Sequence, residues 1–228
     1  MFLRIANILS EEQLATVRAS LNSEKAAWVD GRVTAGHQGA SVKLNRQLDE
    51  ASPMARELGN FILTQLERNA LFISAVLPNK VYPPMFNRYG DGMHFGTHVD
   101  GSVRMIPGSP QKLRTDLSAT LFLAEPQNYE GGELVVESDF GSQSAKYAAG
   151  DLIVYSSTLR HRVNAITRGE RIAGVFWIQS LIREDAQRAQ LFELDATIQR
   201  LTQTGADADS LVRLTGHYHG LLKAWTEI

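Results

Sequence analysis

Apolar residues near the N-terminus follow the spacing of helices that cover a sheet. A short strand is predicted over Phe2–Leu9, and Ser10 with Gln13 forms a capping-box pattern that predicts a helix start. Residues 32–50 show no clear periodicity, and Ser52-Pro53 then predicts the start of a second helix. The apolar stripes are Leu14, Val17 and Leu21 in the first helix, and Met54, Leu58, Phe61, Ile62 and Leu66 in the second.

From Ala70 to Ser180 the pattern changes to short apolar and β-branched runs that glycine-containing turns separate. Many short strands without helices between them favour an antiparallel sandwich or barrel over a parallel βαβ sheet. The expected fold class is therefore mainly β with flanking helices. The predicted strands are Leu71–Leu77, Val81–Tyr89, Leu117–Leu123, Glu133–Val136, Lys146–Ala148, Leu152–Ser156, Arg162–Ile166 and Arg171–Ile178.

After Ser180 the apolar spacing becomes helical again. Thr204-Gly205 separates two stripes, and Asp209 or Ser210 is suited to cap the second helix, so an αα-hairpin is expected. The stripes are Leu191, Leu194, Ile198 and Leu201, then Leu211, Leu214, Tyr218, Leu222 and Trp225. We therefore expect a supporting segment over residues 1–77, a catalytic domain over 78–179 and a small C-terminal helical domain over 180–228.

Composition narrows the possible partners. The chain has 228 residues, 43% of them hydrophobic, which is enough for one large core with a small appendage. The net charge of -2 and the lack of a basic tract argue against nucleic acid and anionic membranes as partners. The sequence shows neither a signal-peptide pattern nor an apolar run of about 18 residues, so a cytoplasmic protein without a membrane span is expected.

A possible metal site lies at His98-Val99-Asp100. The chain contains no cysteine, so any metal must be held by histidine and carboxylate side chains. In an extended segment, residues two apart point to the same face, so His98 and Asp100 converge. They supply two-thirds of a 2-His-1-carboxylate triad, which leaves three positions of an octahedral Fe(II) open.

His161 is the best candidate for the third ligand. It opens a predicted hairpin between His161–Ile166 and Arg171–Ile178, so Arg171 should face the same interior. The other histidines are less suitable. His94 is expected at the rim of the pocket, whereas His217 and His219 fall on a predicted helix, where residues two apart do not converge.

Arg171 suggests what else the pocket binds. A buried guanidinium without a carboxylate is very unfavourable, so Arg171 needs an anionic partner. A dicarboxylate co-substrate supplies one, because its far carboxylate can take the bidentate guanidinium while its 2-oxo acid end chelates the metal.

These residues belong to a longer series of motifs that resembles a known family. The sequence resembles the prolyl-4-hydroxylase type of Fe(II)/2-oxoglutarate dioxygenase in Tyr89-x-x-Gly92-x-x-Phe95-x-x-His98-x-Asp100, Tyr129-x-Gly131-Gly132-Glu133-Leu134, Gly150-Asp151, His161 and Arg171. It is more closely similar to the bacterial PKHD-type hydroxylases in Phe86-Asn-Arg-Tyr89, Gly92-Met93, Phe95-Gly96 and Phe176-Trp-Ile-Gln-Ser180. The resemblance covers nearly the whole chain.

The resemblance implies a double-stranded β-helix core, which is a jelly-roll, cupin-like fold. It implies that His98, Asp100 and His161 bind iron, that Arg171 binds the C5 carboxylate of 2-oxoglutarate, and that Tyr89 hydrogen-bonds this co-substrate near the metal. The expected cofactors are Fe(II), 2-oxoglutarate and O2, with L-ascorbate as a reductant for oxidised iron in related hydroxylases.

The sequence departs from the wider family at two places. Phe95 stands where collagen-type prolyl hydroxylases often carry tyrosine, and the strand Leu117–Leu123 lacks a tyrosine that some relatives place at the C5 carboxylate. Thr120 and Ser118 are both possible substitutes, and the sequence does not choose between them. Tyr129 and the glycines after it are interpreted as structural.

The segment Gly101–Thr115 carries Arg104, Lys112 and Arg114 without a clear strand pattern. Loops of this length often act as lids. Two interpretations stay open, in which these basic residues either meet an anionic substrate or form a solvated charged loop.

The expected activity is hydroxylation of a C–H bond, coupled to the conversion of 2-oxoglutarate to succinate and CO2. The substrate is a prolyl or lysyl residue of a peptide or protein, or a free small molecule, and a homo-oligomer is compatible with the chain. Two alternatives use the same ligands: a cupin-like metal-dependent hydrolase or isomerase, and a non-catalytic module that senses iron or 2-oxoglutarate. The hydrolase or isomerase has no use for a dicarboxylate-binding Arg171, and turnover of 2-oxoglutarate to succinate separates all three functions.

Overall fold

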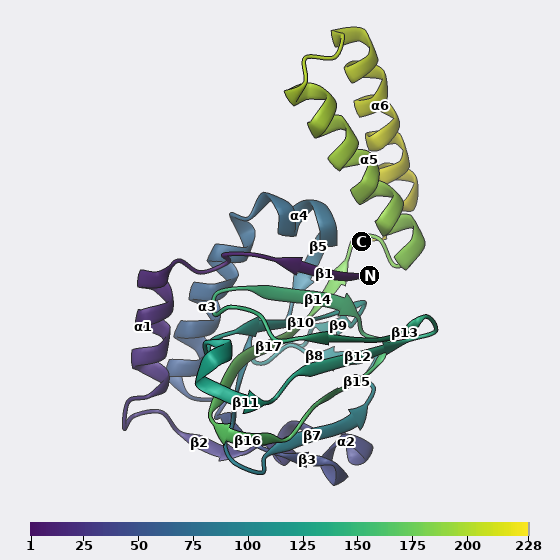
Figure 1. Ribbon diagram of the computed structural model, residues 1–228. Helices are drawn as coiled ribbons and strands as arrows, with labels where there is room; N and C mark the ends of the chain where they lie inside the picture. The colour runs from purple at the N-terminus through teal and green to yellow at the C-terminus, as the bar shows by residue number, and fades with distance from the viewer. Residues whose placement is uncertain (228) are drawn as a thin grey trace.

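The larger of two antiparallel sheets forms the centre of the protein (Figure 1). The computed structural model describes residues 1–227, and Ile228 lies outside the described part. In spatial order the strands are β1 (Phe2–Ile5), β14 (Leu152–Ser156), β10 (Leu117–Phe122), β17 (Arg171–Ser180), β6 (Met85–Tyr89), β4 (Arg46–Leu48) and β2 (Trp28–Asp30), and β5 (Pro78–Val81) also pairs with β17.

The smaller sheet lies opposite, and side chains of both sheets line one cavity of about 730 Å³. Its strands, in spatial order, are β13 (Gly141–Ala145), β12 (Leu134–Ser138), β15 (Arg160–Val163), β7 (His94–His98) and β3 (Lys43–Leu44). Two further pairs join β8 (Val103–Met105) to β9 (Lys112–Arg114), and β11 (Tyr129–Gly131) to β16 (Ile166–Gly169). The mainly β architecture with flanking helices is as expected.

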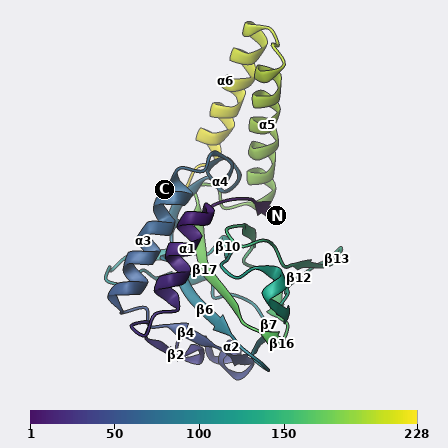
Figure 2. The ribbon, with the colours of Figure 1, turned by 60° about the vertical axis from the view of Figure 1, so that its left-hand side comes forward.

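The two helices predicted near the N-terminus are confirmed, and they lie side by side against the larger sheet (Figure 2). The helix α1 (Glu11–Leu21) begins with the predicted capping box of Ser10 and Gln13. The helix α3 (Pro53–Glu67) begins at Ser52, whose side chain accepts a hydrogen bond from the Ala55 N–H. Short helical segments complete this part of the chain: η1 (Gly31–Thr34), α2 (His37–Ser41) and, later, η2 (Pro126–Asn128).

The strand predicted over Leu71–Leu77 is wrong, because this segment forms the helix α4 (Ala70–Val76). Asn69 caps it by accepting a hydrogen bond from the Phe72 N–H. Phe72, Ala75 and Val76 are buried at helical spacing, so one helix face packs on the core. A run of apolar residues this short fits either period, and here the cap and the tertiary packing decide.

Two other predicted strands have different bounds. The stretch Val81–Tyr89 is divided into β5 and β6 around Pro83-Pro84, since proline has no N–H for a strand ladder. The strand predicted over Lys146–Ala148 is wrong, because the chain is extended and paired only up to Ala145 in β13.

The predicted hairpin between His161–Ile166 and Arg171–Ile178 is also wrong. Both edges of β17 are occupied by β10 and β6, and β15 pairs instead with β12 and β7 of the smaller sheet. The strand β16, which connects them along the chain, pairs with β11. His161 and Arg171 therefore lie on different sheets, and they meet across the cavity between them.

The segment Gly101–Thr115 was predicted to lack strand pattern, but it contains the β8–β9 hairpin. Its three basic residues have different surroundings. Arg104 lines the cavity, Lys112 is exposed, and Arg114 forms ion pairs with Asp116 and Glu227.

The C-terminal αα-hairpin is confirmed, and it projects from the sheets in both views (Figures 1 and 2). It consists of α5 (Asp185–Gln203) and α6 (Ala208–Trp225). The cap of α6 is Asp207, not Asp209 or Ser210, because the Asp207 carboxylate accepts from the Ser210 N–H. Across the described part of the chain, no helix is both long and apolar enough to cross a membrane.

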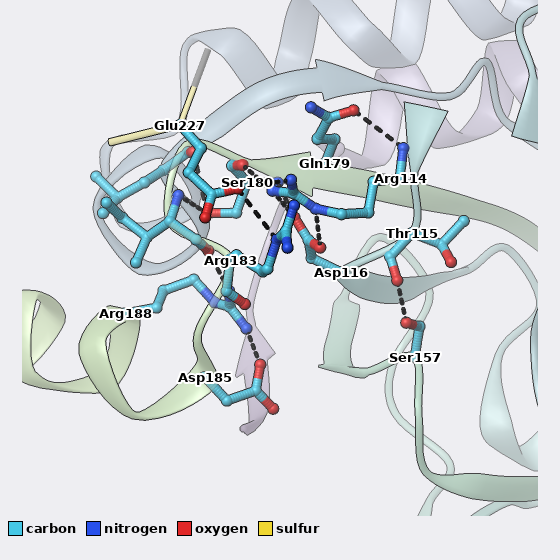
Figure 3. A network of polar contacts seen from close by, with 12 residues as sticks. Arg114, Thr115, Asp116, Ser157, Gln179, Ser180, Arg183, Asp185, Arg188 and Glu227 are labelled. Atoms are coloured by element: carbon cyan, nitrogen blue, oxygen red, sulfur yellow. Dashed lines mark hydrogen bonds and ion pairs between the residues drawn. The ribbon is translucent and has the colours of Figure 1, made fainter. Parts of the chain in front are cut away.

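A polar network joins the base of this hairpin to the core (Figure 3). Arg188 of α5 is completely buried, and its guanidinium donates to the carbonyl oxygens of Ile182, at 2.7 Å, and Arg183, at 3.4 Å. It also forms an ion pair with Asp185. On the core side, the Ser180 hydroxyl donates to the Val76 carbonyl at 2.7 Å, so the connecting segment is fixed at both ends.

We expect Arg188→Ala to destabilise the protein by about 1–3 kcal/mol, because buried carbonyl oxygens lose a charged donor. Arg213→Ala is the matched control, since Arg213 pairs with Asp209 on the surface of α6 and should change stability by less than about 0.5 kcal/mol. Urea unfolding of both variants and the wild type measures the difference. Equal effects of the two substitutions would contradict the role given to Arg188.

Candidate active site

The histidine and carboxylate side chains predicted as a triad are brought together by the pairing of β15 with β7. His161 lies directly opposite His98 in this ladder, and Asp100 follows two residues after His98. One potential ligand atom from each residue lies within 4.8 Å of the others. Strand pairing therefore brings together donors from His98 and His161, which are 63 residues apart in the sequence.

Each imidazole is oriented by a hydrogen bond from its Nδ1. His98 Nδ1 lies 2.8 Å from the Gly96 carbonyl oxygen, and His161 Nδ1 lies 3.0 Å from that of Leu159. A nitrogen that donates to a carbonyl carries the proton, so Nε2 of each ring keeps its lone pair for a metal. Burial, and then the charge of His161, lower the pKa of His98 to about 4, so this ligand is neutral at physiological pH.

The Asp100 carboxylate is held by a hydroxyl group. The Ser118 hydroxyl on β10 donates to Asp100 Oδ2 at 2.5 Å, and this oxygen lies 3.6 Å from His161 Nε2. Phe95 stacks on one face of the His98 ring, with 3.6 Å between the ring centroids, and this contact helps to fix the ring orientation. All three donors therefore have supporting contacts before any ligand is considered, and the donor set of two imidazoles and one carboxylate fits Fe(II).

Arg171 lines the same cavity and has no anionic partner within ion-pair distance among residues 1–227. Its side chain is 1% exposed, and its Nε and Nη1 atoms have no hydrogen-bond acceptor in that range. A buried guanidinium with open donors fits the carboxylate end of a dicarboxylate such as 2-oxoglutarate.

Aromatic rings and a glycine fix the position of Arg171. Tyr89 lies directly opposite on β6, and the guanidinium carbon is 5.3 Å from its ring centroid and 5.7 Å from that of Phe122. Gly132 adopts φ +68°, and a Cβ on it would overlap Ile166 Cδ1 and would lie 3.0 Å from Tyr129 Cε2 and 3.1 Å from Arg171 Cδ. A side chain at Gly132 would therefore displace Ile166 and would also crowd Tyr129 and the arginine stem.

Tyr129 lies close to Arg171, although it is not among the residues that line the cavity. Its hydroxyl is buried without a hydrogen-bond partner within the described chain. Burial raises the pKa of Tyr129, and the nearby positive charge of Arg171 opposes this shift. The Tyr-x-Gly-Gly motif, which we interpret as structural, places both the phenol of Tyr129 and Gly132 close to Arg171.

The structure also separates the remaining candidates. Ser118 is engaged by Asp100, whereas Thr120, two residues along the same strand, faces the cavity without that contact. His94 is not among the residues that line the cavity, and its place at the rim stays a prediction. His217 and His219 are exposed on α6, as predicted.

Comparison with known proteins identifies the family. Residues 84–179 match a family model described as the 2OG-Fe(II) oxygenase superfamily, and residues 185–227 match the PKHD-type hydroxylase C-terminal domain. Proteins named PKHD-type hydroxylase from Burkholderia ambifaria and Cupriavidus metallidurans are each 57% identical over 227 residues, covering 100% of both chains. The chain belongs to the PKHD-type hydroxylases. It is accordingly an Fe(II)- and 2-oxoglutarate-dependent hydroxylase, and the hydrolase, isomerase and sensor alternatives are not supported.

Solved structures show the same fold in more distant proteins. A prolyl-4-hydroxylase from Pseudomonas putida aligns with a TM-score of 0.52 at 19% identity, covering 78% of this chain and 92% of that chain. A viral collagen prolyl hydroxylase from Paramecium Bursaria Chlorella virus-1 gives a TM-score of 0.51 at 16% identity, covering 78% and 95%. The double-stranded β-helix core of this PKHD-type hydroxylase is thus confirmed.

We expect His161→Ala in this PKHD-type hydroxylase to weaken Fe(II) binding by more than roughly 100-fold. Losing a residue that only hydrogen-bonds a metal ligand typically lowers metal affinity by about 10- to 100-fold, and losing a ligand itself should lower it further. His217→Ala removes an exposed histidine of α6 and should leave iron binding unchanged. Anaerobic equilibrium dialysis with Fe(II) compares them. Wild-type affinity in His161→Ala would show that the triad is assigned wrongly.

We expect Gly132→Ala to weaken 2-oxoglutarate binding by roughly ten-fold or more, equivalent to about 1.4 kcal/mol, because its Cβ would displace Ile166 and crowd both Tyr129 and the Arg171 stem. Gly205→Ala is the control: Gly205 has φ +74° against +68° for Gly132, and open space around its missing Cβ. Both variants share the strain of a left-handed alanine. Isothermal titration with 2-oxoglutarate separates them, and equal affinities would mean that Gly132 does not shape the site.

Proposed function

We propose that His98, Asp100 and His161 hold the iron of this hydroxylase. The two Nε2 atoms and a carboxylate oxygen would supply three of the six donors of an octahedral Fe(II), which would leave three positions for co-substrate and O2. Iron, when bound there, supplies the O2 chemistry that couples decarboxylation of 2-oxoglutarate to hydroxylation of the substrate. Support for the assignment comes from the Nδ1 hydrogen bonds and the neutral state of His98.

We further propose that Arg171 binds the C5 carboxylate of 2-oxoglutarate, and this assignment carries the mechanism. The supporting observation is the buried guanidinium with open donors in the cavity that the triad lines. Its fixed orientation between Tyr89 and Phe122 limits the loss of side-chain freedom on binding. The dicarboxylate then spans from the larger sheet to the smaller one.

Tyr89, Tyr129 and Thr120 complete the proposed co-substrate site. Tyr89 is buried in the cavity wall, and its pKa is raised by burial, so its phenol remains a proton donor at physiological pH. Tyr129 brings a second phenol beside Arg171. Thr120 is preferred over Ser118 as the additional C5-carboxylate contact, because the Ser118 hydroxyl is already engaged by Asp100.

We also propose a substrate class, a location for the enzyme and a role for each segment of the chain. The enzyme acts on a small molecule or on a residue of a peptide or protein, in the cytoplasm, with L-ascorbate as a possible reductant. Residues 78–179 carry the chemistry, residues 1–77 support the core, and residues 180–228 serve packing or assembly, including a homo-oligomer. Most of the surface of α5 and α6 is open to a partner, because only Arg188 and Leu191 are buried in α5 and no residue is buried in α6. This exposure supports the role of residues 180–228 in packing or assembly.

We expect Arg171→Ala to weaken 2-oxoglutarate binding by about 30- to several-thousand-fold, corresponding to about 2–5 kcal/mol for breaking a buried charge pair. Arg171→Lys should recover part of this loss, because an ammonium cannot present two parallel donors. Iron affinity should change little in either variant. Anaerobic titration of the Fe(II)-loaded protein, followed by metal-to-ligand charge-transfer absorption, gives the affinities.

Arg168→Ala is the matched control for this titration. Arg168 lies three residues before Arg171, is largely exposed and pairs with Glu130 at the surface. Its loss should leave 2-oxoglutarate affinity unchanged. Equal affinity in wild type, Arg171→Ala and Arg171→Lys would remove Arg171 from the co-substrate site.

A further inference from the structure

The cavity that Arg171 lines also contains a buried lysine. Lys43 of β3 is 7% exposed and lines the cavity. Its Nζ makes one long hydrogen bond, 3.4 Å to Gln47 Oε1, and lies 5.2 Å from the Phe95 ring centroid. In the part of the chain that the structure describes, no carboxylate lies within ion-pair distance of it. A buried ammonium in such surroundings is costly to the folded state.

Arg104 of β8 brings a second cation to the same region. Its guanidinium carbon lies 3.9 Å from the Trp177 ring centroid and 5.1 Å from that of Tyr82, so the group packs against this edge-to-face pair of aromatic rings. Its one hydrogen bond within residues 1–227 goes to the Met85 sulfur at 4.0 Å. An arginine has five N–H donors, and most of these remain available.

The two cations influence each other across this space. Burial, and then the charge of Arg104, lower the pKa of Lys43 to about 8, so Lys43 is still mostly protonated at neutral pH. Like charges in one cavity repel, and the fold keeps both. An anion placed between them would remove this repulsion and would satisfy their open donors.

Protein carboxylates compensate only part of this charge. The Glu50 carboxylate accepts hydrogen bonds from Gln47 Nε2 at 3.0 Å and from the Tyr82 hydroxyl at 3.1 Å, and it does not line the cavity. Asp100 belongs to the proposed metal site. In that site, the charges of Fe(II), Asp100, 2-oxoglutarate and Arg171 sum to zero. Lys43, Arg104 and Glu50 together therefore leave a net charge of one positive unit.

We propose that Lys43 and Arg104 bind a carboxylate of the substrate, so that the hydroxylated compound is a carboxylic acid or an acidic peptide. This inference rests on the proposed function, because it places the substrate anchor beside the metal and co-substrate sites. The ammonium neutralises the carboxylate as a compact charge, and the guanidinium presents a pair of parallel donors. The C–H bond to be oxidised then lies between this anchor and the triad.

The test uses protein loaded with Zn(II) and N-oxalylglycine, which occupies the co-substrate site without turnover. The probes are matched pairs: 3-phenylpropionate with 3-phenylpropanamide, and acetyl-Gly-Glu-Gly-amide with acetyl-Gly-Gln-Gly-amide. Ligand-observed NMR titration gives their affinities. We expect each acid to bind on the order of ten- to a hundred-fold more tightly than its amide, as for hydrogen bonds to charged groups. The pair with the larger preference distinguishes a small acid from a peptide.

Lys43→Met and Arg104→Gln should each abolish the preference for the acid. Lys112→Met is the control, because Lys112 lies on the paired strand β9 and is exposed. Lys43→Met should also leave the thermal midpoint unchanged or raise it, because an apolar group of similar length replaces a buried charge. This readout shows that any loss of binding is not caused by unfolding.

Several outcomes would overturn the inference. Equal binding of acid and amide to the wild type would do so, as would a preference that survives both Lys43→Met and Arg104→Gln. A loss of 2-oxoglutarate affinity in Lys43→Met as large as in Arg171→Ala would assign Lys43 to the co-substrate instead. Failure of the wild type to bind 2-oxoglutarate at all would contradict the proposed function, which separates the two failures.

Discussion

The Arg171 guanidinium is buried between the sheets, and its charge has no partner of opposite sign within ion-pair distance in the described chain. Such a group destabilises the folded protein unless a ligand supplies the anion. The surrounding structure nevertheless fixes it tightly, with Tyr89 opposite in the ladder, Phe122 beside it and Gly132 giving room for its stem. This arrangement favours ligand binding over the stability of the ligand-free state.

The sandwich of two sheets explains why one dicarboxylate can connect the two ends of the site. The smaller sheet supplies His98 and His161, and the larger sheet supplies Arg171, so the proposed metal ligands and the proposed anion-binding residue lie on opposite walls of the cavity. Ser118 on the larger sheet reaches across to Asp100 and ties the walls together. The helical hairpin is attached at the other end of β17, after Ser180, and contributes no residue to the cavity.

Lys43 and Arg104 are two further cations in the cavity that lack an anionic partner within ion-pair distance in the described chain. Each is held by neutral or aromatic groups, through Gln47 in one case and through Trp177 in the other. Neither interaction neutralises the charge, so both residues retain their attraction for an anion. An enzyme that must distinguish one substrate among many cellular metabolites gains selectivity from such unneutralised charges, at the expense of some stability.

Local sequence was sufficient for features that a few neighbouring residues determine. Capping by Ser10 and Ser52, the helical hairpin and the His98-x-Asp100 pair could all be predicted, because caps, helical periodicity and strand alternation act over short distances. Tertiary structure decided the rest. His161 and Arg171 meet across two sheets, not along one hairpin, because the edges of β17 were already paired with distant strands. Lys43 comes from a segment without periodicity and lines the cavity only through packing, and packing also places the Tyr129 phenol beside Arg171. The burial of a charge or a phenol depends on contacts that no short stretch of sequence contains.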